Sequence, residues 1–189
     1  MFKRAIIVAT LLAAATPALA HTGIHSASGF MSGIAHPLGG LDHTLAMIGV
    51  GLFAAMLGRQ ALWALPLSFV GMMLVGGMLG MSGIEIPAVE IGIAVSVVAL
   101  GTVVSLGWRW PIAAAMALVG AFAIFHGHAH GAEIPAGSDA TLYSLGFGLA
   151  SLTLHGLGIV FGLLSLRHMQ AFRLAGAAVA AAGIFLVFT

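Results

Sequence analysis

The sequence predicts an all-α membrane protein, a compact bundle of six transmembrane helices that follows a cleavable signal peptide. Three observations support this fold class. The chain has 189 residues, of which 61% are hydrophobic and 6% charged, and its mean hydropathy is +1.16. Its apolar stretches are long enough to cross a bilayer. Its first twenty residues resemble a secretory signal. A water-soluble domain would not have this composition.

The N-terminal residues 1–20 are expected to be a signal peptide. Lys3 and Arg4 precede a short apolar stretch, which ends in Ala18-Leu19-Ala20, a small-x-small cleavage site. The alternative is an uncleaved first transmembrane helix. Residues 21–37, rich in Gly, Ser and His, are expected to form a short exposed lead-in on the outer side.

Residues 38–189 are predicted to form the transmembrane domain, because a span needs roughly twenty apolar residues. Repeated Gly-x3-Gly spacings at 76–80, 127–131 and 158–162 predict close helix packing. The six predicted spans are about 38–57, 61–82, 86–106, 110–128, 141–165 and 171–188.

Charge placement predicts the orientation of these spans. If the signal peptide delivers the N-terminus outside, six spans place both termini outside. The inner loops then contain Arg59, Arg109, Arg167 and Arg173, and the outer loops contain Glu85, Glu133 and Asp139. This distribution obeys the positive-inside rule.

Composition also excludes several functions. The chain contains no cysteine, so disulfides and thiolate chemistry are excluded. Without Lys3 and Arg4, four basic residues face five acidic ones, which excludes a nucleic-acid-binding basic patch. The chain leaves no room for an ATPase module, and no prosthetic group is expected. The oligomeric state stays open, with a homo-oligomer among the alternatives.

The first candidate site is His36, Asp42 and His43, at the edge of an apolar run where ionisable groups are costly. The two histidines are seven residues apart, about 10.5 Å along a regular helix, too far for both to bind one metal ion. Either the two histidines bind the ion at successive positions along a transport path, which we call stations, or the helix begins after the Pro-Gly-Gly sequence at residues 37–40. Asp42 is expected to ligate metal or to orient His43; a purely structural capping role is the alternative.

The second candidate site is His126, His130 and Glu133. Their i, i+4, i+7 spacing places them on one face of a helix continuing to Pro135, and imidazoles with a carboxylate suit a divalent metal. His128 is expected to point elsewhere unless the glycines unwind the turn, in which case it is a further candidate for metal contact. Ordinary histidines at a helix end are the alternative.

Other residues are weaker candidates for metal contact. Glu90, near the outer end of the third span, either joins the site or points outward. His155 is deep enough to be a second station, with a helix-to-helix hydrogen bond equally favoured. His21 is expected either to capture metal or to lie in a disordered tail. Four methionines (Met72, Met73, Met78, Met81) offer thioethers for Cu(I), although core packing is favoured.

Both motifs resemble those of the HupE/UreJ family of nickel permeases. The resemblance rests on residues 36–43 (HPLGGLDH), the following Ala46-Met47 and Val50-Gly51-Leu52, and residues 125–133 (FHGHAHGAE). It covers nearly the whole chain after the signal peptide. It implies uptake of Ni(II), or of Co(II), across the bacterial inner membrane in support of hydrogenase or urease maturation. The residues it marks are His36, Asp42, His43, His130 and Glu133, and then His126.

The expected function is therefore that of a secondary permease, which moves the ion without nucleotide energy, and not that of an enzyme. Two alternatives stay open. One is an intramembrane metal-dependent hydrolase with Asp42 or Glu133 as general base. The other is a metal sensor or chaperone that binds the ion without transporting it.

Overall fold

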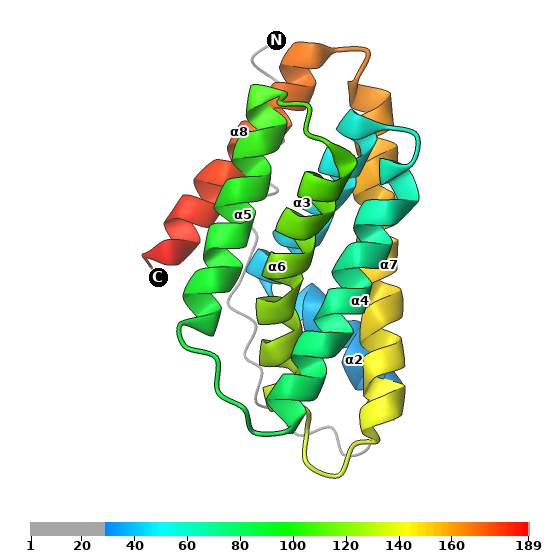
Figure 1. Ribbon diagram of the computed structural model, residues 1–189, viewed down its shortest axis with the longest axis vertical. Coiled ribbons are helices and arrows are strands. Elements are labelled where there is room, and N and C mark those ends of the chain that lie inside the picture. Colours follow the sequence, from blue (N-terminus) through cyan, green and yellow to red (C-terminus); the bar gives the residue numbers. More distant parts are fainter. Residues whose placement is uncertain (1–28, 189) are drawn as a thin grey trace.

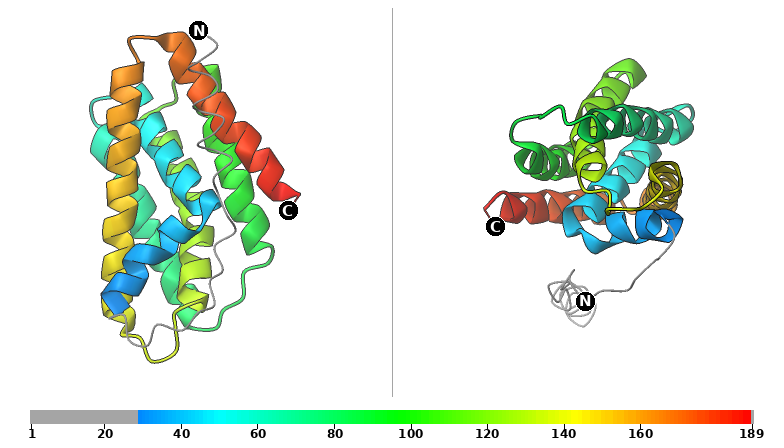
Figure 2. Two further views of the ribbon diagram at one scale, coloured as in Figure 1. Left: turned by 180° about the vertical axis from the view of Figure 1, so that it is seen from behind. Right: turned by 90° about the horizontal axis from the view of Figure 1, so that it is seen from below.

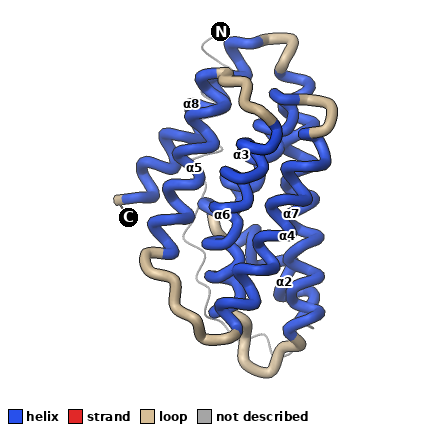
Figure 3. Tube along the Cα trace, in the orientation of Figure 1, coloured by secondary structure: helices blue, strands red, loops and turns tan. Residues whose placement is uncertain are grey.

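Seven helices make up most of the described part of the chain, which is residues 29–188 of a computed structural model (Figure 1). No strand occurs among these residues (Figure 3). The predicted signal peptide (1–20) and His21 lie outside the described residues. The helices are α2 (Gly29–Gly39), α3 (Leu41–Leu57), α4 (Ala61–Met81), α5 (Val89–Leu106), α6 (Ile112–Ala132), α7 (Ala140–Ser165) and α8 (Met169–Val187).

Five of these helices, α4 to α8, are individually long and apolar enough to cross a membrane. Helices α2 and α3 meet that criterion only together, and they are bent by 84° at Gly40. The described residues therefore contain five spans, or six if the bent pair is counted as one. Large apolar side chains face outward, among them Leu164, Leu174 and Phe185, as expected of a lipid-facing surface. The chain is a multi-pass, all-helical membrane protein.

The prediction of an exposed lead-in is wrong for residues 29–37, which form most of α2. This short helix packs obliquely along α7, and Gly29, Gly33 and Pro37 are buried in the contact (Figure 2). Glycine makes the contact feasible, because a Cβ at Gly33 would collide with the carbonyl of Tyr143. The Gly-rich composition that suggested an exposed segment therefore serves helix packing.

Helix α3 is the centre of the bundle. It contacts all six other described helices, and ten of its residues are buried. The remaining helices surround it in the pairs α4–α6, α5–α8 and α2–α7, with α7 also packed along α3. The apolar core therefore lies around α3, and the polar N-terminus of this helix projects toward α6.

The predicted glycine contacts are confirmed. On α4 and α6, a Cβ at Gly76 would meet the carbonyl of Ile124, and a Cβ at Gly127 would meet the carbonyl of Met73. On α7, a Cβ at Gly158 would meet the carbonyl of Ile48 in α3. These helices approach at backbone distance because no side chain separates them.

The charged loops are segregated to opposite ends of the bundle (Figure 1). The connections at 58–60, 107–111 and 166–168 lie at one end, with Arg59 and Arg109 lining one shared depression. The connections at 82–88 and 133–139 lie at the other end (Figure 1). We refer to these as the arginine end and the acidic end. The positions of the histidine motifs relative to them decide how the site is built.

Candidate metal-ion site

The break between α2 and α3 brings His36 and His43 to the same place. Pro37 lies near the C-terminal end of α2, and Gly40 is extended (φ −101°, ψ 124°), so α3 begins afresh at Leu41. The Thr44 hydroxyl donates to the Pro37 carbonyl (3.0 Å) and fixes the bend. Both imidazole rings then lie 4.5 Å, centroid to centroid, from the ring of His130. Of the two predicted arrangements, the structure has the irregular Pro-Gly-Gly entrance.

Helix α6 contributes the histidines that face His36 and His43. His126 and His130 are buried on the face that meets α3, and the rings of His126 and His43 are 4.8 Å apart. The helix ends at Ala132, so the prediction that it continues to Pro135 is wrong. Glu133 still reaches the cluster from the helix C-cap, and its Oε2 lies 3.2 Å from His36 Nε2. The two motifs, 90 residues apart in the sequence from His36 to His126, therefore form one cluster.

Asp42 fixes the tautomer of His43. The carboxylate Oδ1 accepts from the backbone N–H of His43 (2.7 Å) and lies 2.8 Å from the ring Nδ1. Because an ionised carboxylate only accepts, Nδ1 bears the proton and Nε2 keeps its lone pair. His43 Nε2 is buried and has no hydrogen-bond partner. This carboxylate–imidazole arrangement is the one that orients metal-ligating histidines in proteins.

Ser96 fixes the tautomer of His126, a role that the sequence did not predict. The Ser96 hydroxyl donates to the Ile93 carbonyl (2.6 Å), so its oxygen accepts from His126 Nε2 at 3.0 Å. The proton is then on Nε2, and His126 Nδ1 is left bare, buried and without a partner. A lone serine in an apolar helix carries no spacing signal that connects it to a histidine on another helix.

A cavity of about 620 Å³ opens onto this cluster. Its wall includes His36, Asp42, His43, Glu90 and Glu133, so the structure places Glu90 with the predicted site residues. Three carboxylates and two imidazoles facing one cavity favour a cation as its occupant. We call this the acidic cavity.

Comparison with known proteins agrees with the motifs. The sequence model of the family described as HupE / UreJ protein matches residues 9–186. The chain belongs to the HupE/UreJ family. It is 47% identical, over 191 aligned positions that cover 98% of each chain, to the curated Protein HupE of Rhizobium leguminosarum bv. viciae. No solved structure matches the chain.

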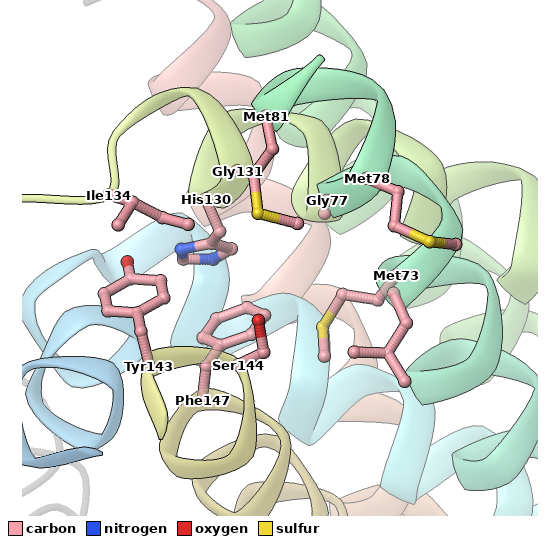
Figure 4. Close-up of a pocket in the computed structure, with 12 residues that line it drawn as sticks. Met73, Gly77, Met78, Met81, His130, Gly131, Ile134, Tyr143, Ser144 and Phe147 are labelled. Carbon is pink, nitrogen blue, oxygen red and sulfur yellow. The ribbon is translucent and has the colours of Figure 1, made fainter. Parts of the chain in front are cut away.

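A second cavity in this HupE/UreJ protein, about 280 Å³, lies on the other side of His130 (Figure 4). It is bordered by α4, α6 and α7, and its wall includes Met73, Met78 and Met81, with Tyr143 and Phe147 opposite. Both ring nitrogens of His130 and the Tyr143 hydroxyl are buried without hydrogen-bond partners. His130 thus stands between the acidic cavity and this second space, which we call the methionine cavity.

Two other histidines of this HupE/UreJ protein lie outside the cluster. His128 Nε2 lies 2.7 Å from the Ile84 carbonyl in the α4–α5 connection, so it points away from the cluster, as predicted. His155 is buried in α7, and the Phe69 ring packs against its ring and against that of His126, with centroid distances of 5.0 and 5.4 Å. Nothing in the sequence singled out Phe69, because an aromatic residue in an apolar span is ordinary.

The ring arrangement of this HupE/UreJ protein is edge-on. The His36–His130, His43–His126 and His43–His130 contacts have interplanar angles of 73°, 85° and 74°. Within residues 29–188, no three His, Asp or Glu side chains are placed so that together they could hold one metal ion. The cluster therefore offers single bare nitrogens and nearby carboxylates, and water would fill the rest of a coordination sphere.

Proposed function

We propose that this HupE/UreJ protein is an ATP-independent permease that takes up Ni(II), or Co(II), across the inner membrane. The observation that carries the proposal is the buried, unpartnered Nε2 of His43, with Asp42 on the other ring nitrogen, at the edge of the acidic cavity. Imidazole is a ligand common to nickel, cobalt and the other late divalent metals. We propose that the imported ion is used in the cytosol for the maturation of hydrogenase or urease.

The electrostatics of the acidic cavity support a cation entering with part of its water. Glu90 and Glu133 lie at its exposed rim, and attract a divalent cation before any ligand bond forms. His36 is paired with Glu133 at 3.2 Å, and an arriving ion would compete for that carboxylate. We infer that the ion exchanges waters for the bare nitrogens of His43 and His126 one at a time.

Loose coordination also suits a permease. A site must bind well enough to admit an ion and weakly enough to release it. A rigid cage of three or four ligands would retain the ion, as structural metal sites do. Isolated bare nitrogens beside a cavity, with no cage of ligands around them, favour passage, which distinguishes this proposal from a resident metal centre of a hydrolase.

Uptake of radioactive nickel into proteoliposomes tests this function. We expect wild-type protein to accumulate nickel down its gradient, and His43→Ala and Glu133→Ala to reduce the rate to that of protein-free liposomes. Glu85→Ala removes an exposed carboxylate from the α4–α5 connection at the same end of the bundle, and serves as the matched control with unchanged uptake. Wild-type protein that binds nickel without moving it across the bilayer would contradict the permease and favour a sensor.

A further inference from the structure

His155 is a buried imidazole that lies outside the histidine cluster. We call that cluster the outer cluster, and it consists of His36, Asp42, His43, His126, His130 and Glu133. The fractional exposure of His155 is zero, and neither of its ring nitrogens has a hydrogen-bond partner. A buried polar group without a partner costs free energy, and native proteins contain few of them. Such a group inside a membrane bundle indicates a ligand that is bound for part of the functional cycle.

The position of His155 sets it apart from the other ionisable residues. Within residues 29–188, the other ionisable side chains belong either to the histidine cluster and acidic end or to the arginine end. His155 lies between these two groups, on the α7 face that packs against α3 and α4. An ion that leaves the outer cluster for the arginine end would find no other imidazole or carboxylate along the described bundle.

Polar and polarisable side chains extend from the outer cluster toward His155. His130 and Met73 line the methionine cavity from two sides (Figure 4). The Ser151 hydroxyl contacts Met73 Sδ at 3.8 Å, and Ser151 lies one turn before His155 on α7. The Phe69 ring packs against both His126 and His155, with centroid distances of 5.4 and 5.0 Å. An ion that moved from His130 toward Ser151 through the methionine cavity would bypass this ring.

We propose that His155, one helical turn from Ser151, is a second station for the transported divalent cation, reached from His130 through the methionine cavity. The proposal rests on the permease function above. Imidazole nitrogen is a common ligand of late first-row divalent metals, Ni(II) among them. Two separate stations let the ion be released from one before it is held by the next, as conduction through multiple sites requires.

His155→Leu, compared with His168→Leu, tests the second station. The control removes an exposed histidine at the arginine end. Both variants are reconstituted in liposomes, and nickel uptake is measured beside equilibrium nickel binding in detergent. We expect His155→Leu to keep the binding of the outer cluster and to lose uptake to the rate of protein-free liposomes, and His168→Leu to match wild type in both.

The outcomes separate this station from the permease function. Wild-type uptake with equal uptake by His155→Leu overturns the second station and leaves the permease intact. Absence of uptake by wild type overturns the permease itself. If His155→Leu does not fold, the variant His155→Cys is used to test the second station instead. The natural chain lacks cysteine, so a thiolate-to-nickel charge-transfer absorption in that variant would place the ion at position 155, and its absence would overturn the proposal.

Discussion

Two histidines of the cluster have one ring nitrogen occupied and the other left bare. Asp42 occupies Nδ1 of His43, and Ser96 occupies Nε2 of His126. The bare nitrogens are thus on opposite ring positions, yet the two rings lie edge to face at 4.8 Å. The sequence predicted the imidazoles, and it left Asp42 open as a metal ligand, a group that orients His43 or a structural cap. It could not predict which nitrogen of His126 is bare, because Ser96 reaches it only through the packing of α5 against α6.

Ser96→Ala is expected to weaken metal binding by about 10- to 100-fold, as the loss of an outer hydrogen-bond partner does at other metal sites. Without the serine oxygen, the proton on His126 is free to move to Nδ1 and block the bare nitrogen. Nickel uptake measured against concentration reports the affinity, and histidine ¹⁵N shifts report the tautomer. Thr102→Ala is the control, because Thr102 donates to a backbone carbonyl on the same helix but is exposed. An unchanged tautomer and affinity in Ser96→Ala would contradict the positioning role.

At the scale of helices, two features bring the motifs together. The break at Gly40 turns α2 back by 84°, so that His36 approaches His43 despite their separation in sequence. The glycines of α4 and α6 let these helices touch, which holds His130 between the two cavities. The helical spacing of the glycines predicted the second of these features. The sequence left the first undecided, because Pro and Gly permit a break without fixing its angle.

Gly127→Ala is expected to destabilise the bundle by about 1–3 kcal/mol, the usual cost of overpacking. Its Cβ would meet the Met73 carbonyl of α4, so the two backbones would have to separate. Thermal unfolding in detergent, with the yield of monodisperse protein, measures the effect. Gly71→Ala, within the partner helix α4, is the matched control, because its added Cβ meets nothing within 4 Å. Equal stability of the two variants would argue against close α4–α6 contact.

In the molecule as a whole, charged residues are segregated to the two ends of the bundle, and this segregation predicts its orientation in the membrane. The arginine end and the acidic end are at opposite ends of the helices (Figure 1). The histidine cluster is near the acidic end, because His130 lies in the last turn of α6 and Glu133 at its C-cap. The positive-inside rule then predicts the arginine end in the cytoplasm, with the acidic cavity facing outward. In this orientation an ion attracted by the carboxylates would travel toward the cytoplasm.

Single cysteines introduced into the cysteine-free chain test that orientation. Ala136→Cys lies in the α6–α7 connection and Gln60→Cys in the α3–α4 connection, and both positions are exposed. A membrane-impermeant maleimide added to intact spheroplasts should label Ala136→Cys at once, and Gln60→Cys only after permeabilisation. The reverse labelling pattern would overturn the proposed direction of uptake.

The all-helical membrane class, the two histidine motifs and the family could all be predicted from the sequence. These follow from local quantities, namely hydropathy over a span, residue spacing along a helix and the identity of ligating side chains. The tertiary structure alone decided how the motifs meet, since His36, His43 and His130 converge through the bend at Gly40. It also decided that Ser96, Phe69 and Met73 belong beside the histidines. Their roles depend on contacts between distant segments, which no single stretch of sequence encodes.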